Sequence, residues 1–273
     1  MKKLAIYQVD AFTSHLFAGN PAAVCPLDEW LDDASLQKLA AENNLSETAF
    51  FVPSGEGCYH LRWFTPTTEV RLCGHATLAT AHVLFNELKT EKNSVNFQSL
   101  SGDLSVSQEA GKLWLNFPVS TCTPCPELLP EMSLALGQTV LELFKTEPDY
   151  NLYAILDSAH TVTSVDPDYA AIAAFHPFGT VVTALGVDVD FVSRYFAPSY
   201  GISEDPVTGS IHTALTPLWS GKLDKQSMQA RQVSARGGQL SVTMQGDRVL
   251  IGGHCVTYMS GEYRHTESAS SDN

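Results

Sequence analysis

Hydrophobic residues alternate with polar ones, or form short continuous runs, along most of the chain, and this pattern predicts many strands and few helices. Aromatic and β-branched residues predict strands in the first part of the chain at 4–12, 48–53, 59–64, 94–100, 104–107 and 113–117. A helix is predicted over 32–43, which Asp32 or Asp33 can cap and a left-handed turn at 43–44 can end. A second helix, over 74–88, is apolar all round, so we expect it to be buried on every side.

Four prolines between residues 118 and 130 interrupt this pattern and indicate a boundary between two structural units. Beyond them lie a mostly apolar helix, over 209–219, and strands near 150–157, 180–185, 189–195, 229–234, 240–244, 248–252 and 255–259. We expect one half-domain over 1–117, which residues 260–266 can complete, and a second over 118–259. The polar residues 267–273 are expected to form a disordered tail.

An internal repeat links the two halves. Residues 64–75 read Phe-x-Pro, a polar loop, Glu, three residues, then Cys-Gly-His. Residues 196–210 read Phe-x-Pro, a loop three residues longer, Glu, three residues, then Thr-Gly-Ser. An apolar helix follows each copy, so we interpret the repeat as a duplication. It predicts two similar α/β halves, each wrapping a curved sheet around one buried helix.

The two helix starts in the repeat are candidate anion sites. The first turn of a helix has free N–H groups and the positive end of the helix dipole, and a glycine there lets an anion approach the backbone. Gly74 and Gly209 would bring two such ends to one cleft, where they could hold a carboxylate. His75 and Ser210 follow them, just inside the helices. Ser210 could instead be a cap, and Asp205 could serve only as a cap or in a turn.

Glu47 is the most informative carboxylate. It opens the run 47–53, whose two faces are both apolar, so the predicted strand lies in the interior. A carboxylate at the mouth of such a strand loses hydration, and its pKa should rise toward the range useful for proton transfer at neutral pH. The alternative is a glutamate that only caps or pairs at a strand end.

The composition excludes some classes of function. The chain has 30 acidic and 16 basic side chains, a net charge of −14, which repels nucleic acid and anionic membranes. No stretch fits a signal peptide or an apolar membrane span, so we expect a cytoplasmic protein. The six cysteines are dispersed, and Cys122 and Cys125 form a C-x-x-C without a partner pair. We therefore expect reduced, structural thiols and no metal site.

Four motifs in order resemble those of the PhzF-like family of phenazine biosynthesis, and the resemblance runs from about residue 7 to residue 259. The motifs are Gly19-Asn20-Pro21-Ala22-Ala23-Val24, Ser46-Glu47-Thr48-Ala49-Phe50, Cys73-Gly74-His75-Ala76-Thr77 and Glu204-Asp205-Pro206-Val207-Thr208-Gly209-Ser210. The resemblance implies the diaminopimelate-epimerase-like fold, an α/β (α+β) fold with two pseudo-symmetric domains and a site in the cleft between them. Each domain is then a curved, mostly antiparallel sheet around a central helix.

The resemblance also implies an activity: isomerisation of a small carboxylated metabolite by proton transfer, without metal or organic cofactor, in a homodimer. Its catalytic residues would be Glu47 as acid/base, supported by His75, Asp205 and Ser210. Substrate contacts would come from Asn20, Cys73, Gly74, Thr208 and Gly209. Pocket walls could include His15, Phe17 and Tyr200.

Two other functions stay open. Related epimerases use two opposed cysteines, and the repeat places Cys73 and Thr208 at those positions. A threonine hydroxyl is a poor acid or base beside a thiol, which disfavours a two-thiol mechanism, although a Cys73-assisted epimerase or racemase is still an alternative. The third reading is a small-molecule-binding protein without catalysis on the same scaffold.

Overall fold

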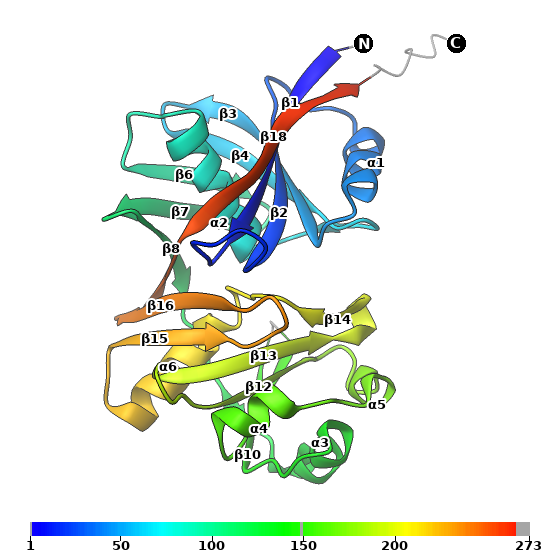
Figure 1. Cartoon of the computed structure of the whole chain (residues 1–273), viewed down its shortest axis with the longest axis vertical. Coiled ribbons are helices and arrows are strands. Elements are labelled where there is room, and N and C mark those ends of the chain that lie inside the picture. Colours follow the sequence, from blue (N-terminus) through cyan, green and yellow to red (C-terminus); the bar gives the residue numbers. More distant parts are fainter. Residues whose placement is uncertain (1, 148–149, 266–273) are drawn as a thin grey trace.

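The computed structural model describes residues 2–147 and 150–265. The chain forms two halves that lie one above the other in Figure 1, each with strands wrapped around one long helix. Both the first and the last strand belong to the upper half, where they run side by side. The tail expected at 267–273 lies outside the described residues. No helix in the described part of the chain is long and apolar enough to cross a membrane.

The first half follows the order expected from the hydrophobic pattern, with one additional buried strand, β2, and a two-residue strand, β5. Its elements are β1 (Lys2–Ala11), β2 (Asn20–Pro26), α1 (Asp33–Asn43), β3 (Glu47–Gly55), β4 (Cys58–Phe64), β5 (Glu69–Val70), α2 (Gly74–His82), a π-helical turn (Val83–Glu87), β6 (Ser94–Ser99), β7 (Gly102–Glu109) and β8 (Lys112–Pro118). The predicted caps of α1 are confirmed: the Asp32 side chain accepts a hydrogen bond from Ser35 N, and Asn44 adopts a left-handed conformation.

The second half repeats this order after a short connection. Its elements are β9 (Thr123–Pro124), a 3₁₀ turn (Pro126–Leu128), α3 (Leu129–Leu136), β10 (Glu142–Thr146), β11 (Asn151–Ile155), α4 (Ala159–Ser164), α5 (Tyr169–Ala173), β12 (Gly179–Leu185), β13 (Phe191–Ala197), a 3₁₀ turn (Pro198–Tyr200), β14 (Ile202–Asp205), α6 (His212–Leu223), β15 (Ser227–Gln232), β16 (Gly238–Gln245) and β17 (Arg248–Gly253). The last strand, β18 (Cys255–His265), returns to the first half.

Strand pairing is the same in both halves. The first half pairs β1–β2 antiparallel, β2–β3 parallel, β3–β4 antiparallel and β4–β6 parallel. The second pairs β10–β11 antiparallel, β11–β12 parallel, β12–β13 antiparallel and β13–β15 parallel. The halves join where β8 pairs with β17. The C-terminal strand β18 crosses to the first half and pairs along β1, and the edge strand β9 pairs with β10. The fold predicted from the repeat and the resemblance is confirmed.

The repeated glutamates have a matched structural role. Glu69 on β5 pairs with Arg62 on β4 at 2.8 Å, and Glu204 on β14 pairs with Arg194 on β13 at 2.7 Å. Both arginines use two nitrogens on the two carboxylate oxygens, a geometry that fixes the orientation of the partners. The repeat therefore preserves the clamp that holds the short strand leading to each glycine.

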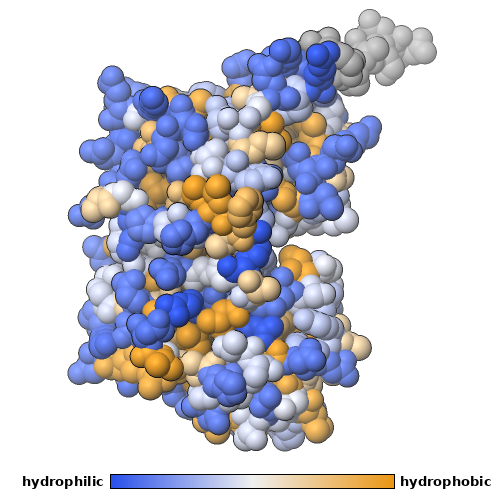
Figure 2. Space-filling view, in the orientation of Figure 1, coloured by the Kyte–Doolittle hydropathy of each residue, from blue (hydrophilic) through white to orange (hydrophobic). Residues whose placement is uncertain are grey.

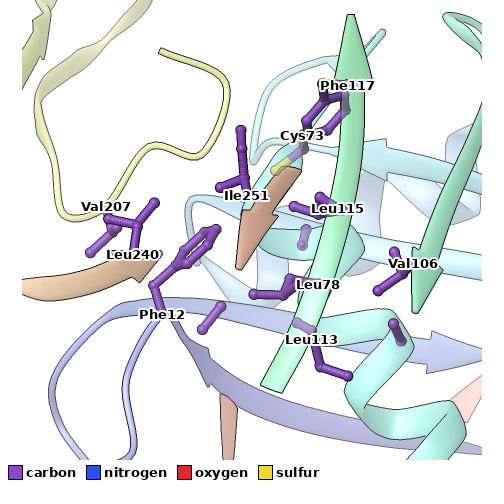
Figure 3. Close-up of a cluster of buried hydrophobic side chains, with 14 of the residues drawn as sticks. Phe12, Cys73, Leu78, Val106, Leu113, Leu115, Phe117, Val207, Leu240 and Ile251 are labelled. Atoms are coloured by element: carbon purple, nitrogen blue, oxygen red, sulfur yellow. The ribbon is translucent and has the colours of Figure 1, made fainter. Parts of the chain in front are cut away.

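The hydrophobic core continues across the seam between the halves. One buried cluster contains residues of the first half, such as Leu78 on α2, and of the second, such as Val207 and Leu240. Figure 3 shows the ring of Phe12 between these groups, and the ring has no exposed surface. Because close-packed interiors resist sliding, a shared core holds the two halves in a fixed relation.

Three sequence predictions are corrected. The second central helix begins at His212 rather than Gly209, so Gly209 and Ser210 lie in the turn before it, where a 3₁₀-type bond from His212 N to Gly209 O tightens the entry. The helix over 74–88 ends its regular part at His82 and continues as a π turn. The proline-rich stretch 118–130 holds β9 and the start of α3, since prolines are acceptable at a helix start and on short edge strands.

Candidate active site

A cavity of about 290 Å³ lies between the two halves, on the side where Figure 2 shows the surface hollowed. Residues of the first half that line it are Glu47, Thr65, Thr67, Thr68, Val70, Leu72, Cys73, Gly74 and His75. Those of the second are Tyr150, Tyr195, Ala197, Tyr200, Ile202, Asp205, Thr208, Gly209 and Ser210. The lining therefore draws on both copies of the repeat, as expected for a site on the pseudo-symmetry axis.

The two repeat glycines meet at the base of this cavity. A methyl group on Gly74 would lie 3.5 Å from the Cα atom of Gly209 and 3.6 Å from the amide nitrogen of Ser210. A methyl group on Gly209 would lie 3.2 Å from Cζ of Phe12, which is tighter than an ordinary contact. Glycine at both positions thus lets two backbone turns approach each other, and Phe12 packs behind them.

Glu47, Cys73 and His75 form a buried group on the first-half wall. Glu47 Oε2 is 3.3 Å from His75 Nε2, and Cys73 Sγ is 3.4 Å from His75 Nδ1. Burial lowers the pKa of His75 to about 3, so the imidazole is neutral at pH 7 and its contact with Glu47 is not an ion pair. Burial, with the Asp205 charge adding to it, raises the pKa of Glu47 to about 8. Burial also raises the pKa of the Cys73 thiol well above its ordinary value.

Asp205 stands on the opposite wall in a hydrogen-bonded frame. Asn20 Nδ2 donates to Asp205 Oδ1 at 2.7 Å and to Val207 O at 2.9 Å, and the Thr208 hydroxyl donates to Asp205 Oδ2. The same Asn20 nitrogen is 3.2 Å from His75 Nδ1, so one amide reaches both walls. Burial raises the pKa of Asp205 to about 6, although the Thr208 and Asn20 hydrogen bonds oppose the shift.

Gln232 holds the turn that carries this frame. Its Oε1 accepts a hydrogen bond from Thr208 N at 2.8 Å, and its Nε2 donates to Asp205 O at 2.7 Å. The side chain is completely buried. Both ends of the amide are therefore committed to the backbone on either side of Pro206, which fixes the Asp205 and Thr208 side chains.

Several buried polar atoms at the site have no hydrogen-bond partner among the described residues. They are Asn20 Oδ1, Glu47 Oε2 and His75 Nε2. An unsatisfied buried polar atom costs about 1–3 kcal/mol, and seven further atoms of this kind lie elsewhere in the described chain, so what distinguishes these three is that they lie close together. Their grouping around one cavity marks this as a place where a ligand or water supplies the missing partners.

The cavity lining contains two carboxyl groups, from Glu47 and Asp205, but neither lysine nor arginine. The donors available to an anion on this surface are hydroxyl and backbone N–H groups, the latter near Gly74, Gly209 and Ser210. The donor atoms of Glu47, Cys73 and His75 lie within 4.8 Å of one another, close enough to hold a metal ion. Before a metal ion could bind there, the Cys73 thiol and the Glu47 carboxyl group, whose pKa values are both raised, would have to lose their protons.

Residues 9–261 match the family model described as phenazine biosynthesis-like protein. The chain belongs to this phenazine biosynthesis-like family. An uncharacterised isomerase of Pseudomonas aeruginosa is 49% identical over 261 residues, which cover 95% of this chain and 98% of that protein. A second uncharacterised isomerase of the same bacterium is 46% identical, over 96% and 99% of the two chains. Both relatives carry the description isomerase, which supports an isomerase type of activity for the family member described here.

Solved structures place the family fold in a wider group. The crystal structure of a PhzF-family protein from Enterococcus faecalis has a TM-score of 0.91 and 43% identity, and the match covers 97% of this chain and 100% of that one. A hydroxyproline epimerase from Agrobacterium vitis has a TM-score of 0.64 at 11% identity, covering 95% and 92%, and is alike in fold.

The structure brings most of the predicted site residues together. Eight of the nine line the cavity, and the ninth, Asn20, lies behind them and hydrogen-bonds to Asp205. Tyr200 lines the cavity as expected, but His15 and Phe17 do not. Their loop is tied to the other side of the seam, because Thr13 N donates to His254 O and Gly19 N donates to Gly237 O. Phe17 is 69% exposed.

The sequence did not predict four further parts of the site: Gln232, Tyr150, Tyr195 and the threonines of the β4–β5 loop. Gln232 lies in a strand predicted only from its periodicity, and no motif marks it. Thr65, Thr67 and Thr68 lie inside the first copy of the repeat. That position was the one feature of the sequence that could have placed them in a site formed by the two copies.

Proposed function

We propose that this protein is a cofactor-independent isomerase that moves a proton on a small carboxylated metabolite, with Glu47 as general acid/base. The observation that carries the proposal is a largely buried carboxyl group that faces a cavity, lies 3.3 Å from a neutral imidazole and has a pKa raised to about 8. A group whose pKa lies near neutrality can both accept and return a proton at useful rates.

In the proposed reaction, the ionised Glu47 takes a proton from a carbon of the substrate and becomes a neutral carboxyl group. The electron pair left behind delocalises into an adjacent unsaturated or carbonyl group. Glu47 then returns the proton to another carbon, so the product is an isomer and no external reductant or oxidant takes part. The neutral imidazole of His75, 3.3 Å from Glu47, would orient the carboxyl group and can relay the proton.

The substrate carboxylate would lie against the backbone near Gly74, Gly209 and Ser210. Two features support this position: the lining contains neither lysine nor arginine, and neither of the two turns carries a side chain at its glycine. Asp205, held by Asn20 and Thr208, would accept a hydrogen bond from a polar substituent of the substrate. Thr208 and Cys73 would contact the substrate beside them.

Deuterium incorporation tests the proposal. Candidate carboxylic acids are incubated with the protein in D₂O and followed by NMR and mass spectrometry. Glu47→Gln should abolish exchange into any accepted substrate, whereas Glu109→Gln, which changes an exposed glutamate on β7, should leave exchange at the wild-type rate. Exchange that persists in Glu47→Gln would overturn the assignment.

A Cys73-assisted epimerase is the second candidate, and the contact between Cys73 Sγ and His75 Nδ1 at 3.4 Å favours it. Two features argue against it. The pKa of the Cys73 thiol is raised, which disfavours the reactive thiolate, and the opposite wall carries Thr208 in place of a second thiol. Cys73→Ser separates the two readings: an epimerase loses activity, while the Glu47 isomerase keeps most of it. Cys58→Ser, which changes a partly exposed thiol outside the cavity lining, is the matched control.

A competing function and the expected oligomeric state can be tested beside this proposal. A binding protein without catalysis would show saturable ligand binding but no solvent exchange with any acid tried, which the same D₂O screen distinguishes. A homodimer is expected, and light scattering coupled to size-exclusion chromatography should give twice the chain mass of 29.7 kDa.

A further inference from the structure

A second cavity, of about 250 Å³, lies on the seam away from the candidate active site. Its walls are the loop after β1 and the segment around the β15–β16 turn: Phe12, Thr13, Ser14, His15, Ala18, Arg231, Arg236, Gly237, Gly238, Gln239 and His254. Two of these side chains are arginines, two are histidines and none is acidic. The first cavity has the reverse character, with two carboxyl groups and no lysine or arginine. The basic lining is notable in a chain of net charge −14.

Both arginines are held in place from behind. Arg236 Nη2 donates to Asp10 Oδ1 at 2.8 Å and to Ala18 O at 3.0 Å, while its Nε donates to Gly19 O at 2.8 Å. None of the hydrogen bonds of Arg236 within the described chain uses Nη1. Arg231 donates from Nη1 and Nη2 to the two oxygens of Asp188 at 3.1 and 2.8 Å. Its Nε makes no hydrogen bond to the described residues. Both aspartates lie outside the cavity lining. They therefore fix the two guanidinium groups before any ligand binds.

We propose that this second cavity binds a small phosphate-bearing anion. Arginine is the residue best suited to phosphate oxygens, because its planar fork offers several N–H donors in a fixed geometry. The hydroxyl group of Ser14, in the same lining, adds a shorter donor. Pockets for drug-sized ligands usually enclose about 300–1,000 Å³, so a cavity of about 250 Å³ suits a small anion such as inorganic phosphate or a small phosphate monoester and is too small for a nucleotide.

Phe12 connects the two cavities. It lines the second one, and its Cζ lies 3.2 Å from the position that a methyl group on Gly209 would take at the base of the first. Its backbone conformation is left-handed, with φ of 61°, and its carbonyl accepts a hydrogen bond from Gln239 N. An anion seated between the arginines therefore contacts the loop whose side chain supports the active-site turn.

Calorimetric titration of the full chain with sodium phosphate, at constant ionic strength, tests the proposal. We expect one saturable site per chain and a loss of affinity of about tenfold or more in Arg231→Gln, since one charged donor is removed. Arg248→Gln, which changes an arginine on β17 bonded to Asn116, should bind as the wild type does. Equal affinity in Arg231→Gln, or no saturation, would overturn the proposal.

Amide chemical shifts then locate the anion, because the backbone near Gly209 could also attract one. Phosphate should move the Gly237 and Gly238 resonances first, whereas shifts confined to Gly74 and Gly209 would place it in the active-site cavity and refute a second site. Neither readout depends on turnover, so failure of the isomerase proposal leaves this result interpretable. Arg231→Gln should keep the wild-type rate of any deuterium exchange measured without phosphate.

Discussion

Glu47→Gln should make the protein more stable, by an amount that grows with pH. The folded state raises the pKa of Glu47 from 4.5 to about 8 by burial, an interval of 8 − 4.5 = 3.5 pH units. Above pH 4.5 the unfolded chain releases this proton while the folded chain keeps it, so stability falls as pH rises toward 8. At about 1.36 kcal/mol per pH unit, the full loss is about 5 kcal/mol. A glutamine has the same shape and no charge to desolvate.

The measurement is the free energy of unfolding in urea at pH 5.5, 7 and 9, followed by the fluorescence of the four tryptophans. Between pH 5.5 and 9 the advantage of Glu47→Gln over wild type should grow by about 3 kcal/mol, because 2.5 of the 3.5 pH units lie above pH 5.5. Glu109→Gln, in which the side chain stays in water, should show a difference that does not change with pH. A constant difference for Glu47→Gln would refute the buried, protonated carboxyl group.

Three further predictions follow from the same geometry. With the pKa of Glu47 at about 8, kcat/KM for proton abstraction should rise about tenfold per pH unit below pH 8, and a limb centred near pH 4.5 would contradict this. Gln232→Leu should lower kcat by about tenfold or more with intact secondary structure by circular dichroism, because Asp205 loses its fixed position; unchanged kcat would exclude a positioning role. Gly19→Ala should cost at least about 3 kcal/mol in urea unfolding, since its Cβ would lie 2.2 Å from Ala11 O, whereas Gly111→Ala, also at positive φ but in open space, should cost about 1 kcal/mol. Equal costs for the two glycines would show that the contact with Ala11 is absent.

Local features of this chain could be predicted because they depend on residues close in sequence. The caps of α1 are hydrogen bonds between Asp32 and Ser35 and a left-handed turn at Asn44, all within one helical stretch. The duplication was visible because each copy keeps Phe-x-Pro, a glutamate, a glycine and a following apolar helix within a short stretch of sequence. The rise in the pKa of Glu47 was predictable in direction, because an apolar strand on both faces implies loss of water.

Tertiary structure alone decided how the candidate site is assembled. Asp205 accepts its hydrogen bond from Asn20, 185 residues away, and its backbone is held by Gln232 from another strand. His15 and Phe17 were expected in the pocket wall, but backbone bonds across the seam turn their loop toward the second cavity. Hydrophobic periodicity specifies which face of an element is buried and not which element covers it. The sequence by itself therefore determined two similar halves and a dehydrated Glu47, and the pairing of those halves decided what Glu47 faces.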